Sequence, residues 1–196
     1  FKVERIKSVA IAGEDSAHTW TIARNTPEDF WRLEGAANAD DFDPVNGNQV
    51  AGALESMLLQ DVVIGAADDA TGLAKPIVVS AKTFDNLTYT VRIGGKKDDQ
   101  RYVRVEVAGE PNKQRTAGAN EKPEDKEKLD KAFAQQLTEF ETRLKHERAL
   151  KDWTFLVPGW KLESMLRTRA QLKADKNKPP PGAMQPMPGM NLPGQN

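Results

Sequence analysis

The sequence has no cysteine and only two histidines among its 196 residues. Without cysteine, the chain cannot form a disulfide bond, a thiolate metal site or a cysteine nucleophile. His18 and His146 are far apart in sequence, and His146 is not followed by the second histidine of a metalloprotease helix. We therefore expect no metal and no cofactor, and no residue stands out from the sequence as catalytic.

Net charge and long apolar runs are also lacking. The formal net charge is −1, from 28 basic and 29 acidic residues, so no basic field is present to attract nucleic acid. No run of about 18 apolar residues occurs, and no signal peptide pattern opens the chain. Because the chain begins with Phe1 in place of methionine, we expect any signal or membrane anchor to lie in an upstream segment.

Alternation of apolar and polar residues is strongest over residues 71–107. Three runs rich in Val, Ile, Tyr and Thr are separated by turns at Asp85-Asn86 and at residues 96–100. This pattern predicts an antiparallel meander of three strands with one buried face. A second three-stranded meander is expected over residues 3–35. The predicted buried faces carry Trp20, Ile22, Tyr89, Val91 and Val103.

The two predicted meanders resemble each other weakly. Residues 18–24 (HTWTIAR) match residues 87–93 (LTYTVRI), and residues 30–34 (FWRLE) match residues 102–106 (YVRVE). One interpretation is an internal repeat of three strands and a helix. The alternative is that alternating strands resemble one another by construction.

The expected fold class is α+β, with the two meanders covered by two or three helices. We expect one domain over residues 1–175, within which an internal repeat would give sub-repeats at residues 1–64 and 71–175. Residues 176–196 are rich in proline and methionine and show no apolar periodicity. This composition predicts a disordered tail.

Capping residues and apolar spacing predict helices at residues 44–60 and 123–150. Asp43 is the expected N-cap of the first helix, with Pro44 at its first position. The long helix carries a narrow apolar stripe, which we expect to lie on the sheet, with a dimeric coiled coil as the alternative. A closing amphipathic helix is expected over residues 161–172. The stripe of the long helix consists of Leu129, Phe133, Leu137, Phe140 and Leu144.

The acidic residues Asp40, Asp41 and Asp43 superficially suggest a calcium loop. However, Gly47 is the seventh residue counted from Asp41, whereas an EF-hand needs its glycine at the sixth position. Gly52 stands at the twelfth position, where the calcium loop has a bidentate glutamate. Helix capping is the favoured interpretation, and a hydrolase that uses the carboxylates near Asp40 to Asp43 is the alternative.

The order of the strand motifs resembles a known bacterial family. The motifs are WTI at 20–22, FWRLE at 30–34, TGLAKP at 71–76, IGG at 93–95, RYVR at 101–104, WTFLV at 153–157 and LRTRAQL at 166–172. Together they resemble the bacterial domain-of-unknown-function family 4340, over about residues 3–172 of this chain. The resemblance rests on structural motifs and involves no catalytic signature.

The resemblance implies a cellular context. Members of the family are typically extracytoplasmic and tethered by an N-terminal transmembrane helix, and some resemble the auxiliary component of ABC-type exporters associated with gliding motility. No catalytic residues are established for the family, so none is carried over to this sequence.

The leading functional hypothesis is a non-enzymatic binding or scaffolding domain. It would be periplasmic or otherwise extracytoplasmic, anchored to the cytoplasmic membrane by an upstream segment, and would serve a transporter or envelope complex as its protein partner. Besides the hydrolase, the other alternative is a self-assembly module that uses the long helix at residues 123–150.

Overall fold

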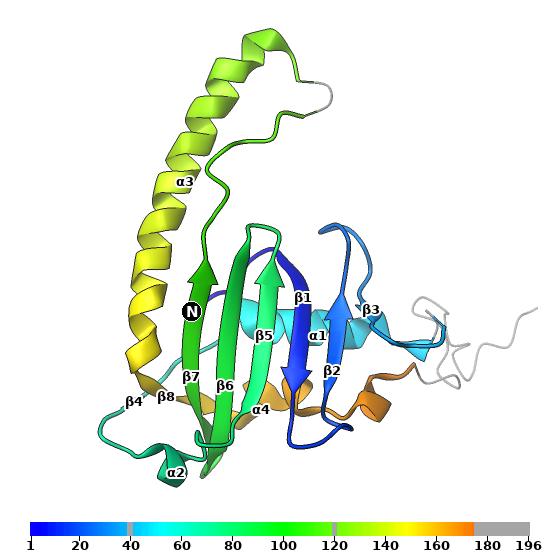
Figure 1. Ribbon diagram of the computed structural model, residues 1–196, viewed down its shortest axis with the longest axis vertical. Coiled ribbons are helices and arrows are strands. Elements are labelled where there is room, and N and C mark those ends of the chain that lie inside the picture. The colour runs from blue at the N-terminus through cyan, green and yellow to red at the C-terminus, as the bar shows by residue number, and fades with distance from the viewer. Residues whose placement is uncertain (39–40, 119–120, 175–196) are drawn as a thin grey trace, which may run out of the picture.

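The computed structural model describes residues 1–38, 41–118 and 121–174, and it has an α+β fold (Figure 1). One open antiparallel sheet of eight strands is accompanied by one long helix and several short ones. The tail predicted at residues 176–196 lies outside the described residues.

The two predicted meanders are present and join into one sheet. The first strands of the two meanders, β1 (Ile6–Ala12) and β5 (Ile77–Thr83), pair directly, and they run antiparallel from the Ile6–Thr83 pair to the Ala12–Val78 pair. The first meander contains β1 (Ile6–Ala12), β2 (Trp20–Ala23) and β3 (Arg32–Leu33), and the second contains β5 (Ile77–Thr83), β6 (Leu87–Lys97) and β7 (Gln100–Gly109). The buried faces predicted from alternation are confirmed, since Trp20, Ile22, Tyr89, Val91 and Val103 are all buried.

Two further strands extend the second meander. β8 (Thr154–Pro158) pairs with β7, and β4 (Val62–Val63) pairs with β8 at the edge of the sheet. The complete strand order is β3-β2-β1-β5-β6-β7-β8-β4. The short helix α2 (Asp68–Thr71) follows β4. The weakly matching segments lie on equivalent strands, β2 with β6 and β3 with β7, and the internal repeat stays a prediction.

Helix α1 (Pro44–Glu55) covers one face of the sheet, behind it in the view of Figure 1. The predicted cap is confirmed, because the Asp43 carboxylate accepts a hydrogen bond of 2.9 Å from the Val45 amide. Val50 and Leu54 on this helix are fully buried. Helix α1 therefore closes the main core over the strands.

The prediction of one closing helix over residues 161–172 is wrong. The chain instead forms α4 (Gly159–Leu162) and two short 3₁₀ turns, Glu163–Leu166 and Arg169–Leu172. The helical stretch ends because Arg167 and Thr168 both have extended backbone angles, and Thr168 then forms a reciprocal capping box with Gln171, which starts a new turn. The apolar side chains of this segment still reach the core, since Leu162, Met165 and Leu172 are buried.

Helix α3 (Lys126–Arg148) exists as predicted, but it does not lie along the sheet. Figure 1 shows that it rises away from the strands, with the segment after β7 running beside it. We call α3 together with residues 110–118 the arm. Along the stripe only Leu144, near the base of the arm, is buried, while Leu129 near the tip is 40% exposed. The prediction that this helix covers a meander is therefore wrong for most of its length. Its C-terminal turns are the part that packs against the sheet.

The polar segment beside α3 is held by ion pairs. Arg115 contacts the carboxylates of Glu121 and Asp130, and its Nη2 lies 2.7 Å from Asp130 Oδ1. The short 3₁₀ turns Pro123–Asp125 and Ala149–Asp152 flank α3 at its two ends.

In the part of the chain that the structure describes, no helix has the length and hydropathy of a membrane span.

Candidate functional site

The acidic residues near the start of α1 have structural contacts. Asp43 caps the helix, and the Asp41 carbonyl accepts a hydrogen bond of 3.2 Å from the Ala174 amide. Asp40 lies outside the described residues. Within residues 1–38, 41–118 and 121–174, no three His, Asp or Glu side chains are placed to hold a metal ion. The hydrolase hypothesis at Asp40 to Asp43 stays a prediction that no described contact favours.

The two histidines occupy separate parts of the molecule. His18 Nδ1 lies 2.8 Å from Asp15 Oδ1 in the turn before β2, and this contact holds the pKa of Asp15 below its usual value. His146 is exposed on α3. The structure therefore does not bring them together.

A buried polar network joins α3 to the sheet. The Tyr89 hydroxyl on β6 donates a hydrogen bond of 2.9 Å to Glu147 Oε2, and Glu147 is only 7% exposed. The other carboxylate oxygen of Glu147 lies 3.8 Å from Arg143 Nε. Arg143 also forms an ion pair with Glu4 at the start of the chain. Three distant segments thus meet at the base of the arm.

Burial and charge shift the proton affinities of this network. Burial, with the Glu147 carboxylate as a second cause, raises the pKa of Tyr89, so its hydroxyl stays a hydrogen-bond donor. Lys2 and Arg143 lower the pKa of Glu4 by hydrogen bonding to its carboxylate. The sequence contains one signal for this network, since Glu147 continues the spacing of the apolar stripe at Phe140 and Leu144.

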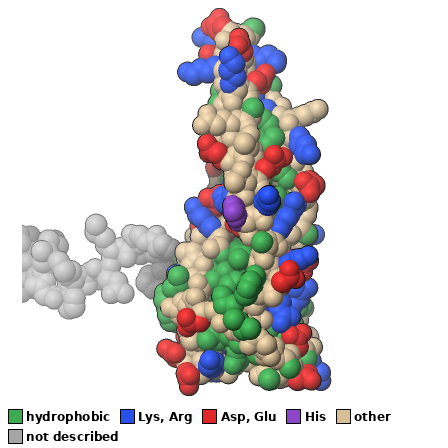
Figure 2. All heavy atoms as spheres, turned by 90° about the vertical axis from the view of Figure 1, so that its left-hand side faces the viewer, with side chains coloured by type: hydrophobic (Ala, Val, Ile, Leu, Met, Phe, Trp, Pro, Cys, Tyr) green, Lys and Arg blue, Asp and Glu red, His purple; other side chains and the backbone are tan. Residues whose placement is uncertain are grey.

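An apolar patch is exposed at the β4 edge of the sheet. It consists of Leu58, Val62, Ile64 and Trp153, which are 49%, 45%, 85% and 46% exposed. We call it the edge patch. The pairs Val62–Phe155 and Val63–Thr154 place Ile64 opposite Trp153, on the same side as Phe155. Because Phe155 is buried, the patch continues the apolar surface of the core out to the edge. Figure 2 shows apolar side chains gathered on this side of the molecule, below the arm.

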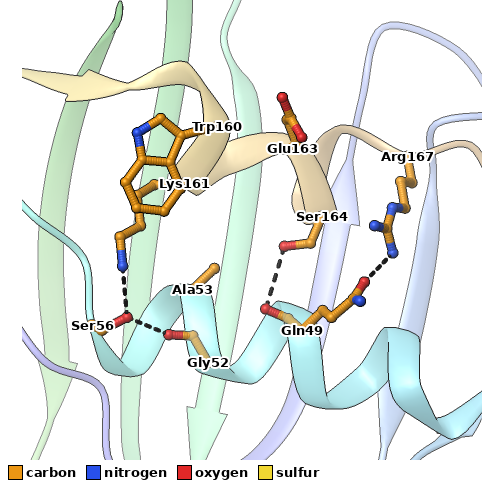
Figure 3. A pocket seen from close by; sticks show the side chains of 9 residues that line it. All are labelled: Gln49, Gly52, Ala53, Ser56, Trp160, Lys161, Glu163, Ser164 and Arg167. Atoms are coloured by element: carbon orange, nitrogen blue, oxygen red, sulfur yellow. Dashed lines mark hydrogen bonds between the residues drawn. The ribbon is translucent and has the colours of Figure 1, made fainter.

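A cleft with a different character lies between α1 and α4. Gln49, Gly52 and Ala53 of α1, with Ser56 at the C-terminal cap of this helix, form one wall. The opposite wall carries Trp160, which is 65% exposed (Figure 3). Its volume is about 280 Å³. We call it the Trp160 cleft. The sequence did not indicate it, because its walls are about a hundred residues apart and carry no recognised motif.

Another hollow runs along the arm. It has a volume of about 620 Å³ and lies between α3, the segment after β7 and the turn before β6. Phe133, Leu137 and Phe140 face it and are half-buried. We call it the arm groove.

No family model, curated protein or solved structure matches this chain. The resemblance to domain-of-unknown-function family 4340 therefore stays a prediction. The three surfaces just described are the basis on which function can be argued.

Proposed function

We propose that this chain is a non-enzymatic binding or scaffolding domain that docks a protein partner on the edge patch. The observation that supports this proposal is the clustering of four exposed large apolar side chains, Leu58, Val62, Ile64 and Trp153, at one sheet edge. Large contiguous apolar patches are rare on monomeric soluble proteins and mark interaction sites.

The geometry of the edge favours an extended partner segment. β4 is the last strand in the sheet order, so its outer side carries main-chain groups that can pair with an added strand. Val62 and Ile64, which are two residues apart on the same side of this edge, would contact alternate side chains of such a segment. The partner would therefore present a short apolar strand, held by backbone hydrogen bonds and by burial of the patch.

The cellular context follows from the family resemblance alone. By that resemblance, the domain works outside the cytoplasmic membrane, is anchored by an upstream segment, and serves an ABC-type exporter or an envelope complex. The edge patch is the surface through which it would contact that complex.

A photo-crosslinking side chain at Ile64 of the full-length protein, in the cells that produce it, should give one discrete protein adduct. The matched control is the same group at Phe30, which is 78% exposed but lies at the other edge of the sheet. Val62→Asp should abolish the Ile64 adduct while changing stability by only about 0.5 kcal/mol, since the side chain is on the surface. Equal labelling at both positions, no adduct, or an adduct that survives Val62→Asp would contradict the proposal.

A second candidate function is self-assembly through the arm. It is favoured by the half-buried residues Phe133, Leu137 and Phe140, which line the arm groove and leave part of the stripe open to a second helix. Sedimentation velocity on the full chain tests it. A dimer that Leu129→Asp dissociates would support self-assembly, and a monomer at all concentrations would exclude it.

A further inference from the structure

Trp160 offers an exposed aromatic platform beside the cleft. Lys161 Nζ lies 4.8 Å from the centre of the indole ring and donates a hydrogen bond of 3.1 Å to Oγ of Ser56, the C-cap of α1. Figure 3 shows the indole in front of the Lys161 side chain, which reaches down to Ser56, and the indole is 65% exposed. A cation beside an exposed indole is only weakly attracted to the ring. The exposed ring surface is open to a ligand.

The wall opposite the indole is shaped by small and polar residues. Gly52 and Ala53 leave the middle of the cleft empty, and a Cβ atom built on Gly52 would meet no atom within 4 Å. Arg167 Nη1 donates hydrogen bonds of 2.5 Å to the side-chain oxygens of Gln49 and Asn46. The amides, hydroxyls and charged groups around the cleft can both donate and accept hydrogen bonds.

A second hollow adjoins the platform. It has a volume of about 360 Å³, lies against the turn between β6 and β7, and shares Trp160 and Glu163 with the Trp160 cleft. Because the indole stands between two hollows, a ligand longer than one ring could cross it and occupy both. This arrangement suits a linear ligand made of repeated polar units.

The charges of the two hollows nearly balance. Their basic residues are Lys96, Arg101, Lys161 and Arg167, and their acidic residues are Asp98, Asp99 and Glu163. A site for a polyanion would carry a clear basic excess, and a site for an apolar peptide would have mainly apolar walls. The ligand that fits is neutral, rich in hydroxyl groups, and has an apolar C–H face for the indole.

We propose that the Trp160 cleft and its adjoining hollow bind a neutral oligosaccharide, with one sugar ring stacked on the exposed indole of Trp160. This ligand site is separate from the edge patch and does not depend on the protein partner proposed there. Hydroxyl groups of the sugar would bond to Glu163 and to the polar side chains of α1.

The test is a calorimetric titration of the full chain with cellohexaose, maltohexaose and chitohexaose, and with heparin as a polyanion. At least one neutral hexasaccharide should bind, and Trp160→Ala should weaken its binding roughly tenfold by removing the stacking surface. Trp153→Ala is the matched control, because Trp153 is also an exposed tryptophan but belongs to the edge patch. It should leave the affinity unchanged.

Gly52→Leu separates loss of binding from loss of folding. Leucine favours the helix more than glycine does, and its side chain has room at the cleft wall. The variant should therefore melt no lower than the parent protein and yet bind the hexasaccharide roughly tenfold more weakly. Failure of all three neutral sugars to bind, binding of heparin alone, or equal losses in Trp153→Ala and Trp160→Ala would overturn the proposal.

Discussion

Replacing Leu144 with alanine is expected to lower the free energy of unfolding by about 2–5 kcal/mol. Leu144 is 2% exposed and belongs to the main core. Of the rest of the stripe, Phe140 packs against that core from a half-buried position, and Leu129, Phe133 and Leu137 are not part of it. It is the residue through which α3 enters the core at the base of the arm. Truncation removes buried methyl groups and leaves a cavity between α3 and the sheet, and both effects destabilise the fold.

Leu137→Ala is the matched control for this prediction. The same substitution is made on the same helix, about two turns nearer the tip, at a residue that is only half-buried beside the arm groove. Its cost should be about 1 kcal/mol or less. Urea denaturation measures the free energy of unfolding of both variants. The comparison requires that the slope of this free energy against urea concentration (the m-value) is the same as in the parent protein. Equal losses for the two variants would mean that α3 packs against the body along its whole length.

The strands were predictable because their alternation is a local signal. Each meander repeats apolar residues at every second position, and the buried residues Trp20, Tyr89 and Val103 follow directly from that period. The pairing of β1 with β5, which unites the meanders, was not predictable. It joins segments about seventy residues apart, and nothing in either strand specifies the other as its neighbour.

The arm shows where helix periodicity stops being informative. The spacing of the stripe correctly predicted a helix and its apolar side, but it could not tell which turns have a partner surface. Leu144 and Leu129 occupy equivalent places in the pattern, and one is buried while the other is exposed. The difference comes from the lengths of the strands, because α3 extends beyond the sheet on which it would pack.

The candidate surfaces depend even less on local sequence. Trp153 and Trp160 are only seven residues apart, yet the first belongs to the edge patch and the second to the Trp160 cleft. Their surroundings are set by β4 and α1, which come from the first third of the chain. Only the assembled fold distinguishes an exposed tryptophan beside polar groups from one beside apolar groups.

Replacing Glu147 with alanine is expected to cost about 2–4 kcal/mol, because it leaves buried polar groups without their partner. The Tyr89 hydroxyl would lose its acceptor, 2.9 Å away. The Arg143 guanidinium, whose buried Nε has no hydrogen-bond partner among the described residues, would lose the nearby negative charge of the carboxylate at 3.8 Å. Glu147→Gln keeps an acceptor for Tyr89 and should cost less, about 1 kcal/mol. Chemical denaturation of the three proteins measures the order.

A double-mutant cycle with Tyr89→Phe isolates the hydrogen bond from the rest of the network. If Tyr89 and Glu147 interact as described, the sum of the stability losses in the two single variants should exceed the stability loss in the double variant by about 1 kcal/mol. Additive losses would show that Glu147 acts only through Arg143.

The raised pKa of Tyr89 gives the same bond a pH dependence with a definite sign. An unfolded tyrosine loses its proton at about pH 10, whereas the folded protein keeps the Tyr89 proton beyond that point. The stabilisation is therefore complete below about pH 10 and declines as the pH rises above it. In the Tyr102→Phe background, where Tyr89 is the sole tyrosine, phenolate absorbance should stay absent at about pH 10 until urea unfolds the chain. Absorbance that appears at this pH in the folded protein would show that the hydroxyl is not held by Glu147 in a buried site.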